Sequence, residues 1–359
     1  MSADSPYPEL KKTHTMAHTG RPWKDYKPPP SGAVWSVINA GNTYWMLVAA
    51  IDLGVFDALE PETPTTANEL SANLGVSQDG LRHLLDCLVT LEFLDQIDGL
   101  YELTETAERY LRSDGPVSMV SLVRVSPGPI ENWMGLAETI RSGHVKTPID
   151  DDIAGFYHPL ISATFPTQYR VASRLGAIMG WSRYTNLRVL DLGAGAAPWS
   201  SALLEQAKNS TAVVNDFQLI VEVAEATMAS KGFSECCEFR AGNFHEIDIE
   251  EGGYDMVFLG HVCRTEGEDR TDSLVKRAVA GLKPGGAIVV ADYFSDNDRR
   301  ANAFGVMMGL TMLANTRYGG AITFDQMYRH LAVNQIENIR VLEPIGANMV
   351  FVGTKTVRG

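Results

Sequence analysis

Cysteine is scarce in this sequence, and no pair of cysteines has a spacing that predicts a disulfide bond or a metal centre. The 359 residues contain four, Cys87, Cys236, Cys237 and Cys263, with no C-x-x-C pair. Adjacent cysteines make a poor disulfide, so the simplest interpretation is a cytoplasmic protein with reduced thiols. His245, His261, Cys263 and Asp292 also match no ligand spacing, so no metal is expected.

Basic residues and long apolar runs are also in short supply. Thirty Lys and Arg face 44 Asp and Glu, a net charge of −14. This balance disfavours binding to nucleic acid or to an anionic membrane, because both need a basic surface. The apolar stretch "YWMLVAAIDLGVFDAL" is interrupted by Asp52 and Gly54 and is shorter than the roughly 20 residues of a membrane span, so a buried helix is expected.

The N-terminal third has the outline of a winged helix. Residues 1–30 are polar and proline-rich, with no signal-peptide pattern, and predict a disordered arm. Within residues 31–115, Thr66 and Glu69 have capping-box spacing, Gly75 marks a helix end, and Asp98-Gly99 predicts a hairpin turn. Residues 64–112 carry nine acidic and three basic side chains. This charge argues against a DNA-binding transcription factor and favours a packing or dimerisation module.

The rest of the chain predicts an α/β domain. Residues 116–180 are expected to be linking helices that contribute to a substrate pocket. From residue 181 to 359, strand-like runs alternate with helical patterns, which predicts a mostly parallel sheet covered on both faces. The last two runs, "NIRVLEPIG" and "NMVFVGTKT", are separated by a short turn and are expected to pair antiparallel.

A glycine-rich turn points to a nucleotide-like cofactor. "VLDLGAGAAPWS" places Asp191, Gly193 and Gly195 between a strand and a helix, where the backbone permits close approach of a ligand. A second acid, Asp216, ends the next strand, where it would hold ribose hydroxyls. Two further motifs come later in the chain: "AGNF" follows the third strand-like run, and "GLKPGG" precedes the fifth. A dinucleotide oxidoreductase shares the glycine loop but has no reason to keep these two motifs, and Asp191 has the alternative of capping a helix.

In this order, the motifs resemble class I S-adenosylmethionine-dependent methyltransferases. More narrowly, residues 33–355 resemble small-molecule O-methyltransferases with an N-terminal winged-helix dimerisation domain. The resemblance implies a seven-stranded Rossmann-like sheet with an antiparallel last strand, S-adenosyl-L-methionine as cofactor, and a homodimer. It also implies the cofactor contacts: Asp191, Gly193 and Gly195 at the methionine part, Asp216 at the ribose, and Asn243 and Phe244 at the adenine. Phe217, next to Asp216, is a further candidate cofactor-binding residue.

His261 stands where this family keeps its catalytic base, just after the fourth strand. The chain departs from the family nearby: Ala197 replaces a glycine, Asn243 the commoner Asp, Val262 an acid and Cys263 an aromatic residue. A base without a carboxylate fits an acidic enol or phenol acceptor. The alternatives are C-methylation, or a non-methyl reaction such as cyclisation, decarboxylation or hydroxylation.

Arg264 lies in "CRTEGEDRTD", which we expect to be a loop. It would stack on the adenine or clamp an acidic substrate, or else be a solvated arginine paired with Glu266 or Asp269, which the commonness of exposed ion pairs favours. The sequence predicts methyl transfer to a hydroxyl of a small aromatic or polyketide-like metabolite. Its pocket would use side chains of the linking helices and of the stretch after the fifth strand: Trp133, Met134, His158, Asn302, Met308, Met312 and Asn315.

Overall fold

The computed structural model describes residues 32–125, 128–345 and 347–357. The arm expected over residues 1–30 lies outside these ranges. The chain divides into two compact units, one ending at Arg124 and the other beginning at Val125. Each unit has a core of its own, and each is described separately below.

The N-terminal unit has the winged-helix arrangement. Its elements are α2 (Gly32–Asp52), α3 (Val55–Ala58), β1 (Thr65–Thr66), α4 (Ala67–Leu74), α5 (Gln78–Thr90), β2 (Leu94–Ile97), β3 (Leu100–Leu103), α6 (Glu105–Tyr110) and, at the junction, α7 (Val120–Val125). The sheet order is β1-β3-β2. The predicted capping box of Thr66 and Glu69 is confirmed, and Gly75 ends α4 in the left-handed conformation. Asp98 and Gly99 turn the hairpin with φ of 53° and 82°.

The early apolar stretch is helical but only partly buried within its unit. Gly54, at φ 74°, separates α2 from α3. Within the stretch itself, Ala50, Ile51, Val55 and Phe56 are buried in the unit's core, whereas Trp45 is 50% exposed. The expected burial therefore holds for the second half of the stretch and is wrong at its start. None of the described helices has the length and apolarity needed to cross a membrane.

The C-terminal unit contains the predicted seven-stranded sheet, in the order β6-β5-β4-β7-β8-β10-β9. Its strands are β4 (Arg188–Leu192), β5 (Thr211–Asp216), β6 (Cys237–Ala241), β7 (Tyr254–Gly260), β8 (Leu282–Asp292), β9 (Ile336–Ile345) and β10 (Asn348–Lys355). β4 to β8 pair in parallel, and β10 is antiparallel to both β8 and β9. The fold expected from the sequence is confirmed.

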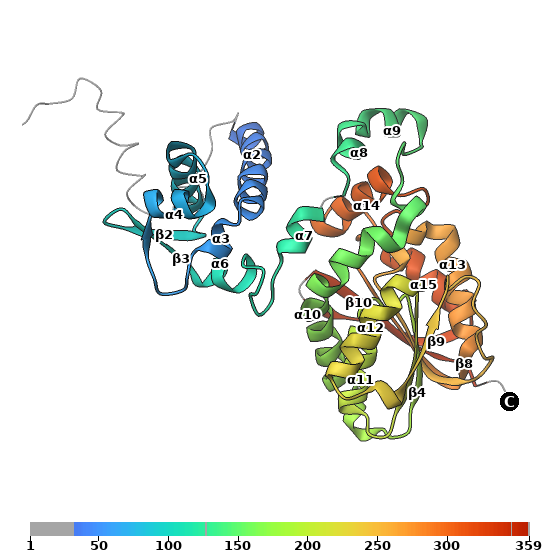
Figure 1. Cartoon of the computed structure of the whole chain (residues 1–359). Helices are drawn as coiled ribbons and strands as arrows, with labels where there is room; N and C mark the ends of the chain where they lie inside the picture. The colour runs from blue at the N-terminus through green and yellow to red at the C-terminus, as the bar shows by residue number, and fades with distance from the viewer. Residues whose placement is uncertain (1–31, 126–127, 346, 358–359) are drawn as a thin grey trace, which may run out of the picture. The chain divides into compact units, whose positions relative to one another are not determined.

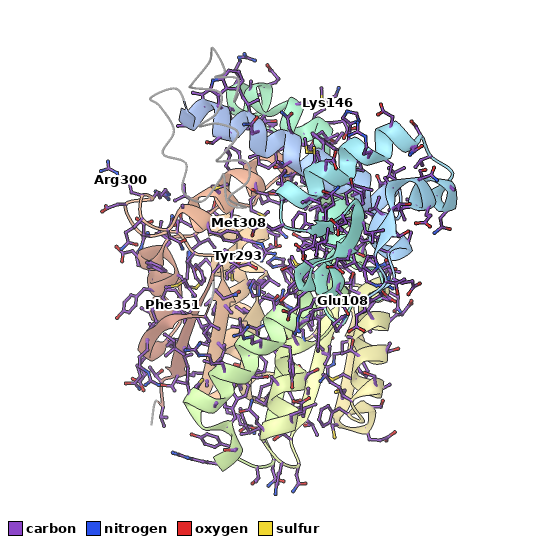
Figure 2. The ribbon with its side chains drawn as sticks, turned by 90° about the vertical axis from the view of Figure 1, so that its left-hand side faces the viewer. Glu108, Lys146, Tyr293, Arg300, Met308 and Phe351 are labelled. Atoms are coloured by element: carbon purple, nitrogen blue, oxygen red, sulfur yellow. The ribbon has the colours of Figure 1, made fainter. Side chains whose placement is uncertain are left out.

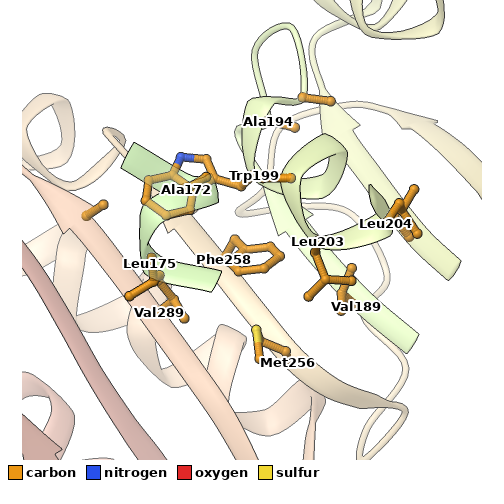
Figure 3. Close-up of a cluster of buried hydrophobic side chains, with 14 of the residues drawn as sticks. Ala172, Leu175, Val189, Ala194, Trp199, Leu203, Leu204, Met256, Phe258 and Val289 are labelled. Carbon is orange, nitrogen blue, oxygen red and sulfur yellow. The ribbon is translucent and has the colours of Figure 1, made fainter. Parts of the chain in front are cut away.

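Helices cover both faces of the sheet (Figure 1). One face carries α10 (Ile153–Met179), α11 (Pro198–Gln206) and α12 (Gln218–Ser230), and the other carries α13 (Cys263–Gly281) and α15 (Phe324–Val333). Figure 3 shows the core beneath the first group, where Trp199 and Phe258 pack among aliphatic side chains. The remaining helical elements are α8 (Ile130–Met134), α9 (Leu136–Ser142), η1 (Ile149–Asp152), η2 (Trp181–Arg183), η3 (Ser234–Cys236) and α14 (Ala303–Asn315).

The stretch "CRTEGEDRTD" is helical, so the expected loop is wrong. α13 begins at Cys263 and is interrupted by non-helical backbone at Gly267, with φ 67° and ψ −175°. The backbone passes so close to Tyr318 that a Cβ on Gly267 would lie 2.0 Å from the Tyr318 carbonyl oxygen. Only glycine accommodates this kink. The charge-rich segment therefore continues as helix on both sides of Gly267.

Candidate functional site

The predicted cofactor residues gather at one edge of the C-terminal unit. Because β4 to β8 are parallel, their carboxyl ends meet at the same edge, which is where ligands bind in open α/β sheets. Asp191 lies in β4 just before the glycine turn, Asp216 ends β5, and Asn243 follows β6. His261 follows β7, and Arg264 lies in the first turn of α13.

Asp191 has one oxygen engaged and one without a partner. Its Oδ2 accepts hydrogen bonds from the backbone N–H and the Oγ–H of Ser200 at 3.1 and 2.7 Å, so it caps the start of α11. Its Oδ1 is buried and has no partner among the described residues. Burial raises the pKa of Asp191 to about 7. The capping alternative thus holds for one oxygen, and the other is available to a donor.

Asp216 lies against the glycine turn. Its Oδ2 accepts from the Gly195 N–H at 2.8 Å and its Oδ1 from the Phe217 N–H at 2.8 Å. Each oxygen keeps a second lone-pair site for a hydroxyl. Burial raises the pKa of Asp216 to about 6. A vicinal diol would supply the hydrogen bonds that compensate this burial.

The glycine turn is closely packed. Gly193 has φ 66°, and a Cβ there would lie 2.4 Å from Cγ1 of Val262 and 3.5 Å from Cε1 of Phe244. The side chain of Val262 therefore packs against the glycine turn, at the position where the resemblance implies an acidic residue. Ala197 has φ 57°, a conformation that usually favours glycine, the residue that the family resemblance implies at this position.

The "AGNF" motif is tied to α13 through the histidine that follows it. Asn243 Oδ1 accepts from the His245 N–H at 2.9 Å. His245 Nε2 lies 2.6 Å from Glu266 Oε2, and Arg270 Nε donates to the same oxygen at 2.7 Å. Glu266 is thus engaged by His245 and Arg270, not by Arg264. Adenine contact by Asn243 and Phe244 stays a prediction.

His261 is buried at 6% exposure, with a left-handed backbone at φ 66°. Its Nε2–H donates to Asn348 Oδ1 at 2.5 Å, an assignment that fits because the amide of Asn348 donates to Ile345 O. The lone pair then lies on Nδ1, which has no partner within the described parts of the chain. Burial lowers the pKa of His261 to about 4, with Asp292 opposing the shift. His261 is therefore neutral at physiological pH and offers one weakly basic nitrogen.

Arg264 is not a solvated arginine. Its Nη1 donates to Asp292 Oδ1 at 3.1 Å and to the His261 carbonyl at 2.5 Å, and its backbone N–H donates to Asp292 Oδ2 at 3.0 Å. The side chain is 15% exposed and that of Asp292 is 2% exposed. The expected partners, Glu266 and Asp269, are wrong because Asp292, at the end of β8, supplies the carboxylate across the sheet edge.

Two tyrosines that sequence reasoning missed complete this end of the sheet. Tyr293 follows β8, with its ring 5.4 Å from the Arg264 guanidinium carbon and its ring centroid 5.0 Å from that of His261. Tyr157, on α10, lies near enough to Arg264 for the guanidinium to act on its phenol. Burial raises the pKa of both phenols, and Arg264 opposes the shift. Their signal was weak: each stands inside an aromatic-rich run, "FYHPL" or "ADYF", that core packing explains equally well.

The predicted substrate residues fall on α8, α10 and α14. The packing of Tyr293 against Phe304, with centroids 4.9 Å apart, places α14 next to the site, and in Figure 2 Met308 lies just above Tyr293, with Phe351 lower in the view. Met308 is half-buried and Met312 is buried in this helix. Trp133 is half-buried and Met134 is 81% exposed, both on α8, and His158 is exposed on α10.

The two predicted amide anchors have structural contacts. Asn302 caps α14, with Oδ1 accepting from Gly305 N–H and Nδ2 donating to Phe294 O at 2.6 Å. Asn315 is buried, its Oδ1 accepts from Asn132 at 3.2 Å and its Nδ2 donates to Thr311 O. Substrate contact by Asn302 and Asn315 stays a prediction. The hydrogen bond between Asn315 and Asn132 connects α14 to α8.

The site fits the expected methyl donor. Asp191 Oδ1 is a buried acceptor without a partner, suited to an ammonium or hydroxyl, and Asp216 is suited to a ribose. The turn at Gly193 leaves no room for a side chain, so its backbone is open to close approach by a ligand. These residues would hold S-adenosylmethionine, which when bound supplies an electrophilic methyl group.

Comparisons with known proteins agree with the expected family and its methyl donor. Residues 35–113 match the O-methyltransferase dimerisation domain, and residues 176–335 match the O-methyltransferase domain. The chain is 24% identical over 317 residues to the tetracenomycin polyketide synthesis 8-O-methyl transferase TcmO of Streptomyces glaucescens, covering 86% of this chain and 92% of that protein.

Two further similarities cover almost the same span. The 3-hydroxy-5-methyl-1-naphthoate 3-O-methyltransferase of Streptomyces sahachiroi is 25% identical, with 86% of this chain and 91% of that protein covered. The crystal structure of human N-acetylserotonin methyltransferase in complex with SAM superposes with a TM-score of 0.80 at 22% identity, covering 93% of this chain and all of that one. The chain belongs to the S-adenosylmethionine-dependent O-methyltransferases that carry an N-terminal dimerisation domain.

Proposed function

We propose that this enzyme methylates a hydroxyl on an aromatic, polyketide-like metabolite in the cytoplasm. The observation that carries the proposal is the site edge itself, where acids suited to the methyl donor share the carboxyl end of the sheet with Arg264 and the ring of Tyr293. Two relatives that match most of the chain are named for aromatic or polyketide hydroxyl acceptors, which supports the same substrate class.

In this proposal the protein positions its reactants and the acceptor supplies much of its own reactivity. Asp191, Asp216 and the backbone of the glycine turn orient the methyl donor. Aromatic and methionine side chains on α8 and α14 hold a flat acceptor in line with the methyl carbon. His261, neutral with a free Nδ1, is the candidate proton acceptor. Its low pKa makes it a weak base, which suits an acidic hydroxyl.

The test is methyl transfer to a defined panel of acceptors. Purified enzyme is incubated with methyl-labelled S-adenosylmethionine and hydroxynaphthoates, hydroxyanthraquinones and simple phenols, and products are separated by chromatography. Label in an O-methyl ether is the expected result. Tight binding of S-adenosylhomocysteine together with no labelled product from the panel would contradict the proposal.

A second candidate is non-methyl chemistry on the same fold. One observation favours it: no carboxylate hydrogen-bonds His261 among the described residues, and its ring partner is the neutral amide of Asn348. Conversion of a panel member without transfer of label would identify this alternative, because the methyl donor would then be recovered intact.

A further inference from the structure

The guanidinium of Arg264 is the centre of a polar cluster built from three elements of the C-terminal unit. Asp292 at the end of β8 fixes it by two hydrogen bonds, one to the backbone and one to Nη1. The guanidinium carbon lies over the ring of Tyr293, 5.4 Å from its centroid, and Tyr157 lies nearby on α10. An arginine held on two sides in this way has one orientation, which leaves its remaining edge fixed in space.

That remaining edge has unused donors. A guanidinium carries five N–H groups, of which the two on Nη1 go to Asp292 and to the His261 carbonyl. Nε and Nη2 make no hydrogen bond to a carboxylate or carbonyl oxygen among the residues that the structure describes. The phenol hydroxyls of Tyr157 and Tyr293 donate to no protein acceptor within the same described residues. Unused donors from three side chains are thus collected around one position.

The charge at this position is balanced so that an anion is favoured. Both oxygens of Asp292 are engaged, because Oδ1 accepts from Arg264 Nη1 and from the Tyr293 N–H at 2.8 Å, and Oδ2 accepts from the Arg264 backbone N–H. It therefore acts as a fixed counter-ion behind the guanidinium. Burial would lower the pKa of Arg264, but Asp292 and the two phenols more than offset this and raise it, so the guanidinium stays charged. Burial keeps both phenols protonated and able to donate.

We propose that Arg264, Tyr157 and Tyr293 form an oxyanion site that binds the acceptor as its ionised hydroxyl, so that the substrate class is acidic phenols and enols. This inference rests on the proposed function, because it names the form in which the acceptor is methylated. It also accounts for the weak basicity of His261, since no proton has to be removed once the anion is bound.

The chemical step then balances without a base. The anionic oxygen forms the O–CH₃ bond while the S–CH₃ bond of the donor breaks, and the electron pair of that bond stays on sulfur, which becomes a neutral thioether. The proton of the acceptor has already gone to solvent before binding. Arg264 neutralises the bound oxygen, and its hold must loosen as the ether forms, which assists release of the neutral product.

Binding of a coloured acid tests the site directly. The probe is 4-nitro-1-naphthol, whose anion absorbs visible light, titrated into enzyme saturated with S-adenosylhomocysteine. Bound dye is expected as the anion even below its solution pKa. Arg264→Gln should weaken anion binding about 10- to 100-fold, the range of a charge-assisted hydrogen bond. Dye bound as the neutral naphthol, equal affinity in both proteins, or no binding to the wild type would overturn the proposal.

Milder variants guard against a folding defect, since Arg264→Gln leaves Asp292 buried and unpaired. Tyr157→Phe and Tyr293→Phe remove only a hydroxyl, and each is expected to weaken dye binding about 3- to 10-fold, the range of a neutral hydrogen bond. Arg264→Lys should retain part of the affinity. Unchanged affinity for S-adenosylhomocysteine in all variants is the control. If the variants lose dye binding only when they also lose affinity for S-adenosylhomocysteine, the result counts against the site.

The pH profile separates this inference from the proposed function. The pH dependence of kcat/KM is measured for several phenols that the enzyme methylates. The apparent pKa of each profile should equal the pKa of the phenol used. A single value common to all acceptors would show an enzyme base and overturn the inference while the function stands. Anionic dye binding in an enzyme that methylates no acceptor would instead reject the function and keep the site.

Discussion

The imidazole of His261 can accept a proton only through Nδ1, because Nε2 already donates to Asn348. Replacing this amide with a carboxylate, Asn348→Asp, gives the ring the acidic partner that it lacks. We expect the pKa of His261 to rise from about 4 by about 1 to 3 units, the effect of an adjacent opposite charge. The measurement is the pH dependence of the imidazole ring signals in an NMR spectrum.

The catalytic consequence separates a base from a packing residue. If the Nδ1 of His261 takes the proton, Asn348→Asp should move the acidic limb of kcat to higher pH, and His261→Ala should abolish most turnover. Full turnover in His261→Ala would leave His261 with the packing role that its burial indicates. Asn338→Asp, the same change at an exposed position of β9, is the control and should alter neither signal nor rate.

Asp216 links cofactor binding to the pH dependence of stability. Its folded-state pKa of about 6 lies above the unfolded value near 4. The native state therefore binds the proton more tightly, so this contribution to stability is complete below about pH 4 and is lost as pH rises through 6. Asp216→Asn should reduce the fall in unfolding free energy between pH 5 and 8 by about 1 kcal/mol.

The same variant should bind S-adenosylhomocysteine about 10-fold or more weakly, because an amide accepts fewer hydrogen bonds than a carboxylate. Denaturant unfolding at several pH values and calorimetric titration give the two quantities. Asp95→Asn, which changes an exposed carboxylate of the N-terminal unit, should leave both as they are. An unaltered pH dependence in Asp216→Asn would show that Asp216 is ionised in the free protein.

At the scale of elements, the kink in α13 holds the segment after α14 in place. Gly319 and Gly320 lie against Arg264, whose carbonyl accepts from the Gly320 N–H at 2.9 Å, and the backbone of Gly267 touches Tyr318. Gly267→Ala would add a Cβ into this contact at a strained φ. We expect it to destabilise the protein by about 3 kcal/mol and to weaken methyl transfer, because α13 carries Arg264.

Thermal unfolding and activity at a permissive temperature would measure these effects. Gly80→Ala in α5 is the matched control, since its Cβ would meet only ordinary contacts at 3.6 Å. That variant is expected to be neutral or slightly stabilising, as alanine favours helix over glycine. Equal stability of the two variants would mean that the Tyr318 segment can move aside at little cost.

Elements and motifs could be predicted from sequence because their signals are local. The capping box at Thr66, the strand runs and the acid that ends β5 each depend on residues a few positions apart. The state of His261 could not be predicted, because Asn348 is 87 positions away and pairs only through the order of β7, β8 and β10. The partner of Arg264, at the end of β8, is hidden for the same reason. Local acids in "TEGED" suggested a different one.

At the scale of the whole molecule, α2 exposes an apolar surface that the described residues of the N-terminal unit leave uncovered. Val34, Trp35, Ile38 and Trp45 are 63, 60, 48 and 50% exposed. The matched dimerisation domain begins at residue 35, at the start of this surface. Apolar patches of this kind mark protein interfaces, and self-association through α2 in a homodimer is the arrangement that both observations support.

The double variant Trp35→Glu/Ile38→Glu should therefore shift the protein from twice its 39.2 kDa chain mass to the monomer mass in light scattering at micromolar concentration. Carboxylates opposite their own copies repel across a two-fold interface and must lose their hydration, which disfavours the dimer. Val333→Glu, at a 72% exposed position that ends α15, adds charge elsewhere and should leave the mass unchanged. A dimer that survives the double variant would place the interface away from the start of α2.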